Sequence, residues 1–245
     1  MAWTTENGLN KARYILAGGG NNSNALSFGG DDDIEYLRTT ESWNGICWFS
    51  ENGLNTATGG LAGGGDSSNA ISFGGRSSYL ATTESWNGIC WTAENGLNTS
   101  RYFLAGGGDS SDALSFGGHL VKATTESWNG ICWTAENGLN TGRSRLAGGG
   151  DTGNAISFGG NDGNILATTE SWSKTPITGT VTLNGAGVQG AYVEIWNKTQ
   201  NATYIRKDVT DADGNYSIFP NALKNDVVLI SVHYEDGSGL SLIHI

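Results

Sequence analysis

The stretch TTESWNGICWTAENGLN, residues 82–98, recurs almost unchanged around residues 39 and 124. Its second half opens the chain as AWTTENGLN (2–10), and its first half ends the series as TTESWSK (168–174). The two tryptophans of the phrase therefore each occur four times, at residues 3, 48, 91 and 133 and at residues 43, 86, 128 and 172. The spacing of 42 to 45 residues predicts a repeat protein and is typical of a four-stranded propeller blade.

Local patterns within each repeat favour strands over helices. The runs RYFLAGGG (101–108), NAISFGG (69–75), YLATTESW (79–86) and GICWTA (88–93) are short, and Gly, Asn, Asp and Ser separate them. Such runs, rich in aromatic and β-branched residues, are typical of strands. Asn-Gly at 44–45, 87–88 and 129–130 predicts a tight hairpin between the third and fourth strands.

The two ends of the repeat region complement each other. The fourth repeat reaches Trp172 without an NGICW strand of its own, and the opening residues AWTT could supply that strand. The sequence thus predicts a four-bladed ring closed by the N-terminal strand, the low end of the usual blade range. The alternative is a fragment of a larger ring, whose end faces would stay uncovered.

The order Arg101, Gly117–Gly118, Glu126, Trp133 resembles a kelch-type propeller repeat. With LNTxRxxLAGGG and TTESWNG, residues 1–173 are similar to the kelch-like arrays in structural proteins of tailed bacteriophages. Repeat two departs from the pattern, because Thr58 stands where the other repeats have Arg13, Arg101 and Arg143. The resemblance implies an all-β, four-bladed kelch-like β-propeller that belongs to a virion.

The composition changes after Pro176, which places a second domain at 174–239. Here GTVTLNGAGVQGAYVEIW followed by TDADGNYSI resembles the carboxypeptidase-regulatory-like, or transthyretin-like, domains. Five strands are expected, fewer than that family has, so the predicted Ig/transthyretin-like β-sandwich is truncated. The final residues LSLIHI (240–245) match the translation of a sequencing adapter, and we expect them to be read-through of non-biological origin.

Charge and cysteine usage restrict the possible partners. The formal net charge is −11 with only 13 basic residues, so we expect no nucleic acid partner. No run of about 18 apolar residues exists, so we expect no membrane insertion. Cys47, Cys90 and Cys132 occupy one repeated position, one repeat apart, and are expected to be unpaired and at least half-buried.

No catalytic set is recognisable, and we predict neither an enzyme nor a cofactor nor a metal site. His119 and His233 fall in different domains. The repeated acids Glu41, Glu84, Glu126 and Glu170 could ring a cation, but a structural acceptor role is favoured. The DADGN loop (211–215) and the GGGDSSNA-type hairpins (Asp66, Asp109, Asp151) are expected to be turns rather than ion sites.

The segment between Gly-Gly and Thr-Thr-Glu varies from repeat to repeat. The four copies read DDDIEYLR, RSSYLA, HLVKA and NDGNILA. A rigid scaffold that displays variable loops on one face is typical of a binding surface, although unconstrained drift would give the same variation. The candidate ligand contacts are Asp31, Asp32, Asp33, Tyr36, Arg76, Tyr79, His119, Lys122, Asn161 and Asp162.

These observations favour a non-enzymatic binding and structural module. The resemblance implies a phage tail fibre or appendage that attaches to a host-surface glycan or protein, together with other virion proteins. The alternatives are a bacterial secreted adhesin at the cell surface and a glycan-active propeller enzyme.

Overall fold

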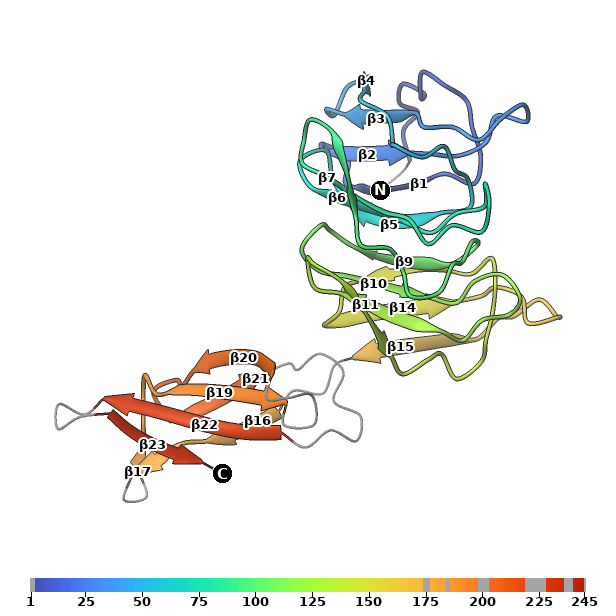
Figure 1. Cartoon of the computed structure of the whole chain (residues 1–245). Helices are drawn as coiled ribbons and strands as arrows, with labels where there is room; N and C mark the ends of the chain where they lie inside the picture. The colour runs from blue at the N-terminus through green and yellow to red at the C-terminus, as the bar shows by residue number, and fades with distance from the viewer. Residues whose placement is uncertain are drawn as a thin grey trace. The chain divides into compact units, whose positions relative to one another are not determined.

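A computed structural model of the chain describes residues 3–173, 177–183, 186–197, 203–218, 228–235 and 240–244. The chain divides into two compact units, Met1–Ser173 and Lys174–Ile245, which we describe separately. All regular elements in the described ranges are β-strands or isolated bridges, without a helix (Figure 1).

The first unit is a four-bladed β-propeller arrangement of small antiparallel sheets. Blade 1 contains β1 (Ala17–Gly20), β2 (Ala25–Phe28), β3 (Thr40–Trp43) and β4 (Trp48–Glu51). Blade 2 contains β5 (Ala62–Gly65), β6 (Ala70–Phe73), β7 (Thr83–Trp86) and β8 (Trp91–Glu94). Blade 3 contains β9 (Ala105–Gly108), β10 (Ala113–Phe116), β11 (Thr125–Trp128) and β12 (Trp133–Glu136). Blade 4 contains β13 (Ala147–Gly150), β14 (Asn154–Phe158) and β15 (Thr169–Ser173). The four strand runs expected in each repeat are therefore found in blades 1 to 3.

The hairpin at Asn-Gly occurs where it was expected, although its loop has four residues. Trp43 pairs with Trp48, which leaves residues 44–47 as the loop. The Asn44 carboxamide oxygen accepts hydrogen bonds from the backbone N–H groups of Ile46 and Cys47, at 2.9 and 3.0 Å. Gly45 has φ = +90°, a conformation that glycine adopts without strain.

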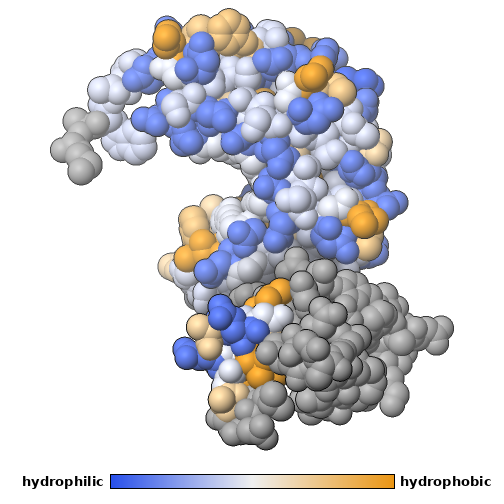
Figure 2. Space-filling model, turned by 90° about the vertical axis from the view of Figure 1, so that its left-hand side faces the viewer, coloured by the Kyte–Doolittle hydropathy of each residue, from blue (hydrophilic) through white to orange (hydrophobic). Residues whose placement is uncertain are grey.

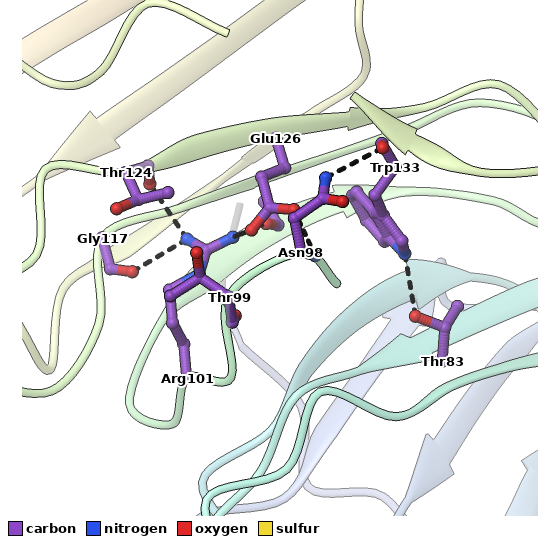
Figure 3. A network of polar contacts seen from close by, with 9 residues as sticks. Thr83, Asn98, Thr99, Arg101, Gly117, Thr124, Glu126 and Trp133 are labelled. Atoms are coloured by element: carbon purple, nitrogen blue, oxygen red, sulfur yellow. Dashed lines mark hydrogen bonds and ion pairs between the residues drawn. The ribbon is translucent and has the colours of Figure 1, made fainter. Parts of the chain in front are cut away.

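The hydrophobic core lies between successive blades. The Trp91 ring on the outer strand of blade 2 packs edge-on against Phe28 of blade 1, with 4.9 Å between ring centroids. The Trp91 indole also donates to the Thr40 hydroxyl at 2.9 Å. Trp133 repeats both contacts with Phe73 and Thr83, as Figure 3 shows for the hydrogen bond. Trp91 and Trp133 thus each join their own blade to the preceding one.

The predicted closure by the N-terminal strand is not found in the structure. Within residues 3–173, residues 3–9 form no strand, and Trp3 is fully exposed at 103%. The inner strands pack in the order β1, β5, β9 and β13, and β13 has no comparable packing on β1 among the described residues. The four blades therefore form an open arc, in which the strand that would complete blade 4 lies elsewhere.

The cysteine expectation was half right. Cys47, Cys90 and Cys132 are unpaired, as expected. Cys90 and Cys132 are exposed rather than half-buried, because they lie in the hairpin loop before the outer strand.

The described residues of the second unit form three further sheets. Strands β16 (Ile177–Thr180) and β21 (Asn215–Ile218) pair, as do β17 (Thr182–Leu183) and β18 (Ala186–Gly187). The third sheet has the order β20 (Thr203–Val209), β19 (Tyr192–Asn197), β22 (Val228–Glu235), β23 (Leu240–His244). β23 includes residues for which we predict a non-biological origin, and that origin stays a prediction. The Asp211 carboxylate accepts from the backbone N–H groups of Asp213 and Asn215, so the DADGN loop is a turn.

Candidate binding face

The variable segments start at a fixed backbone reversal in each blade. Both glycines that follow the second strand have positive φ, for example +70° at Gly74 and +129° at Gly75. The N–H of Gly75 donates to the carbonyl of Arg101 in the next blade at 2.9 Å, and Gly118 repeats this bond with Arg143. The start of each loop is thus fixed to the neighbouring blade, while the residues beyond it differ from blade to blade.

Each variable loop lies against a pair of residues that ends one leucine before its own inner strand. Asp31 bridges Tyr14, the Arg76 N–H donates to Gly59, the His119 N–H donates to Tyr102, and Asn161 bridges Ser144. These partner positions also vary between blades, as Tyr-Ile (14–15), Gly-Gly (59–60), Tyr-Phe (102–103) and Ser-Arg (144–145). Two sets of variable residues therefore share one face of the arc.

The second residue of each pair adopts a left-handed backbone. The φ angles are +46° at Ile15, +64° at Gly60, +53° at Phe103 and +52° at Arg145. A hydrogen bond joins each to the one before, from Gly60 N–H to Ile15, from Phe103 N–H to Gly60 and from Arg145 N–H to Phe103, at 2.8 to 2.9 Å. Strain of this kind at non-glycine residues accumulates at functional sites. The residues at these four positions line a cavity of about 460 Å³.

Six side chains from three blades form an aromatic and cationic cluster on this face. It consists of Arg76, Tyr79, Tyr102, Phe103, His119 and Arg145, and we call it the aromatic–arginine cluster. His119 stacks on Tyr102 with 4.3 Å between centroids, and Tyr79 meets Tyr102 edge-on at 5.2 Å. The Arg145 guanidinium lies 4.7 Å from the centroid of Phe103, and that of Arg76 lies 5.6 Å from it.

The cluster offers both stacking surface and positive charge. Tyr79 is 58% exposed, and both arginines are exposed, so a ligand can reach them. Burial raises the pKa of Tyr102, and its hydrogen bond with Tyr79 raises it further, which keeps the phenol protonated. The cluster is thus a local cationic and aromatic patch on a chain with a net charge of −11.

The acidic loop of blade 1 is a separate region. The Asp32 carboxylate accepts from the N–H groups of Ile34 and Glu35 and pairs with the Lys11 amine at 2.6 Å. The hydrogen bond from Lys11, aided by these N–H groups, lowers the pKa of Asp32 to about 2. Burial, followed by the charges of Asp31 and Asp33, raises the pKa of Tyr14. Asp31 and Asp32 therefore accept hydrogen bonds from the backbone of their own loop and stabilise its conformation.

The ten residues predicted as ligand contacts from the sequence therefore do not form one site. Arg76, Tyr79 and His119 meet in the cluster. The group Asp31, Asp32, Asp33 and Tyr36 lies in the loop of blade 1, and the side chains of Asn161 and Asp162 accept hydrogen bonds from the N–H groups of Gly163 and Asn164 within their own loop. Lys122 lies in the variable loop of blade 3, where its N–H donates to the carbonyl of Gly118.

Sequence reasoning missed three members of the cluster, Tyr102, Phe103 and Arg145. The signal was present, because these positions vary inside the otherwise repeated LNTxRxxLAGGG.

The repeated glutamates have the structural role that was favoured. The Glu126 carboxylate is buried and accepts from Arg101 at 2.8 Å and from the N–H of Asn98 at 2.7 Å (Figure 3). The Arg101 guanidinium also donates to the carbonyls of Gly117 and Thr124, at 3.0 and 2.9 Å. Burial lowers the pKa of Arg101, and the charge of Glu126 opposes that shift. Arg13–Glu41 and Arg143–Glu170 repeat the pair.

The aspartates of the GGGDSSNA-type hairpins form turns as expected. The Asp66 carboxylate accepts from the N–H groups of Ser68 and Asn69, and Asp109 and Asp151 do the same in their blades. Across the described residues, no three metal-ligating side chains gather. The same part of the chain has no helix that could cross a membrane.

No protein-family model matches the chain, and no curated protein sequence matches it either.

Proposed function

We propose that the chain is a non-enzymatic binding module whose ligand is a surface glycan that carries carboxylate groups. The observation that carries this proposal is the aromatic–arginine cluster. Sugars stack on exposed aromatic rings, and arginine binds a carboxylate through two parallel N–H donors. Tyr79 is 58% exposed and packs on the buried Tyr102, beside which Arg76 also lies, so one acidic sugar unit could stack on Tyr79 and pair with Arg76. Arg145, exposed beside Phe103, offers a second donor.

The composition of the cluster agrees with reversible attachment. It exposes two arginines and the ring of Tyr79, which suits a ligand that is itself polar. Figure 2 shows one face of the molecule, on which the hydrophobic patches of the described residues are separate from one another. Weak single sites of this kind become effective when several act together on a surface.

The setting that we propose is a kelch-like array in a phage tail fibre or virion appendage, followed by a transthyretin-like sandwich. It rests on the residue patterns of residues 1–173 and 174–239. A bacterial secreted adhesin with the same face is the alternative setting, and a glycan-active propeller enzyme is the alternative activity.

The test is binding of the full chain to immobilised glycans that contain uronic or sialic acid, beside neutral glycans of the same length. We expect binding to the acidic set only. Tyr79→Ala and Arg145→Ala should each weaken it about tenfold, the effect of about 1.4 kcal/mol from one stacking or charge contact.

Ile131→Ala is the matched control, because Ile131 is 69% exposed, against 58% for Tyr79, but lies in the hairpin loop at the other end of blade 3. Equal binding to neutral glycans, or equal losses with the control, would remove the cluster as the site. Shortened glycan products in the same samples would favour the enzyme.

A further inference from the structure

The outward face of blade 4 is apolar and uncovered. Ile156 and Phe158 on β14 are 47% and 45% exposed. Their equivalents in blade 3, Leu114 and Phe116, are 0% and 2% exposed because blade 4 covers them. Blade 4 therefore presents a surface that, in every other blade, lies against a following blade.

The inner strand of blade 4, β13, is likewise not covered by a following strand. A Cβ atom on Gly64 would lie 2.7 Å from the carbonyl oxygen of Gly108, and one on Gly107 would lie 2.8 Å from that of Gly150. A Cβ atom on Gly149, the equivalent residue of β13, would meet nothing within 4 Å. The backbone of a following inner strand would fit against Gly149 as β9 and β13 fit against Gly64 and Gly107.

The outer edge of blade 4 carries an open socket. A cavity of about 190 Å³ is lined by Phe116, Thr125, Leu139 and Trp172, among others. Phe116 and Thr125 are the equivalents of Phe28 and Thr40, which hold the ring of Trp91. The repeat pattern therefore identifies the missing occupant as an outer strand that begins with tryptophan.

The other end of the arc carries a segment with the sequence of such a strand. Residues 3–6 read WTTE, against WTAE in β8 and β12. The following residues already hold the position of a link between blades. The side chain of Asn7 donates to the carbonyl of Ile46, and the N–H of Asn10 donates to Glu41, as Asn52 and Asn55 do in blade 2. Residues 3–6 are thus placed as the outer strand of a blade that would precede blade 1.

We propose that the open face of blade 4 binds the N-terminal end of a second copy of this chain, head to tail. In this contact Trp3 of one copy enters the socket between Phe116 and Thr125 of the other, and residues 3–6 pair with β15. The register of the other blades gives the pairs Trp172 with Trp3 and Ser171 with Thr4. Blade 1 of the second copy then covers Ile156 and Phe158.

A second copy fits better than the same chain for a geometric reason. Residues 7–10 are fixed to blade 1, and β1 and β13 end opposite sides of the open arc. A different surface of each copy takes part, so the contact is heterologous. Such contacts form a closed ring only if the rotation that relates the copies permits it. Two copies would complete eight blades, within the range that propellers use.

Disulfide trapping between two singly substituted full chains tests the contact. Cys47, Cys90 and Cys132 are first replaced by serine. A Thr4→Cys chain is then mixed with a Ser171→Cys chain under mild oxidation. Directly opposed strand residues have Cα atoms about 4.5–5.5 Å apart, which a disulfide can span. We expect a covalent dimer of twice the 25.6 kDa chain mass.

The matched control mixes Thr4→Cys with Ser42→Cys, since Ser42 is the equivalent residue of blade 1 but already faces Phe49. This mixture should give at least tenfold less dimer. No dimer with Ser171→Cys would overturn the proposal. A chain carrying both Thr4→Cys and Ser171→Cys that links only to itself would overturn it too, in favour of closure within one chain.

Gly149→Ala supplies an independent measurement that leaves the socket intact. The added methyl group has free space in the single chain but would meet the backbone of the second copy. We expect the fold to be kept, by circular dichroism, and self-association in analytical ultracentrifugation to weaken at least tenfold. Unchanged association would contradict the proposed packing.

Discussion

Blade 2 shows what the buried arginine contributes, because it lacks one. Thr58 replaces the arginine, yet Glu84 stays buried. Its carboxylate accepts instead from the N–H and side-chain amide of Asn55, at 2.7 and 2.9 Å, and from the N–H of Thr56 at 3.0 Å. Hydrogen bonds to a carboxylate can keep it charged without a cation. Blade 2 is therefore a natural variant of the arginine–glutamate network inside the same molecule.

We expect Arg101→Thr, which copies blade 2 into blade 3, to lower the free energy of unfolding by about 3 kcal/mol. The cost arises because a buried carboxylate loses its ion-pair partner, and the carbonyls of Gly117 and Thr124 lose a donor. Urea denaturation measures it. Arg38→Thr is the control, since Arg38 is exposed, and it should cost less than about 0.5 kcal/mol. Equal losses would show that the network adds no stability.

Part of this residue-scale chemistry was predictable. The glutamates recur in the third predicted strand of each repeat, which indicated hydrogen-bond acceptors with a structural role. The replacement of the repeated arginine by Thr58 was also visible in the sequence. The aromatic–arginine cluster was only partly predictable. Tyr79 and His119 belong to different blades, and their contact with Tyr102 depends on how neighbouring blades pack.

The inner strands set how closely the blades approach. Each has the sequence AGGG, and in β1, β5 and β9 the middle glycine faces the last glycine of the next inner strand. Backbones can pack this tightly only where no Cβ atom intervenes. The high glycine content, 39 residues, is thus partly a requirement of the blade interfaces.

We expect Gly64→Ala to destabilise the first unit by about 2 kcal/mol, because the new methyl group would overpack the interface with β9. Gly8→Ala is the control, as a Cβ atom there meets nothing within 4 Å. That change should be neutral or slightly stabilising, since it restricts the unfolded chain. Thermal unfolding of both variants measures the difference. An equal midpoint for the two would show that the blades can move apart freely.

Strands and hairpins could be predicted at this scale because each depends on a short segment. The Asn-Gly loop and the alternation of core residues were local signals. The pairing partner of residues 3–6 could not be predicted in this way, since the same tryptophan-bearing segment can pair with any blade that lacks its outer strand. The sequence identified the segment and the vacancy, and the structure shows that they are apart.

At the scale of the whole first unit, the angle between blades decides whether four of them close. The repeat period predicts one blade per unit but does not contain that angle, which accumulates over successive interfaces. The rotation at each interface therefore decides between a closed ring and the open arc, in which β1, β5, β9 and β13 pack in succession. Both ends of an open arc expose surfaces that resemble the interior interfaces.

Thermal stability should consequently depend on protein concentration. If the ends cover each other in a second copy, association stabilises the folded state by mass action, and the unfolding midpoint rises by roughly 2–4 °C for each tenfold increase in concentration. Differential scanning calorimetry across a hundredfold range measures this rise. Gly149→Ala should show a flat dependence. A flat dependence in the unaltered chain would mean that the ends stay uncovered.

The hydrogen-bonded series from Ile15 through Gly60 and Phe103 to Arg145 has an evolutionary consequence. Main-chain atoms alone make these bonds. The backbone therefore keeps its path whether the position holds an aliphatic residue, a glycine, an aromatic residue or an arginine. Mutation at these places can alter which molecule is recognised while the fold is inherited unchanged. Diversification of specificity is thereby separated from the maintenance of stability.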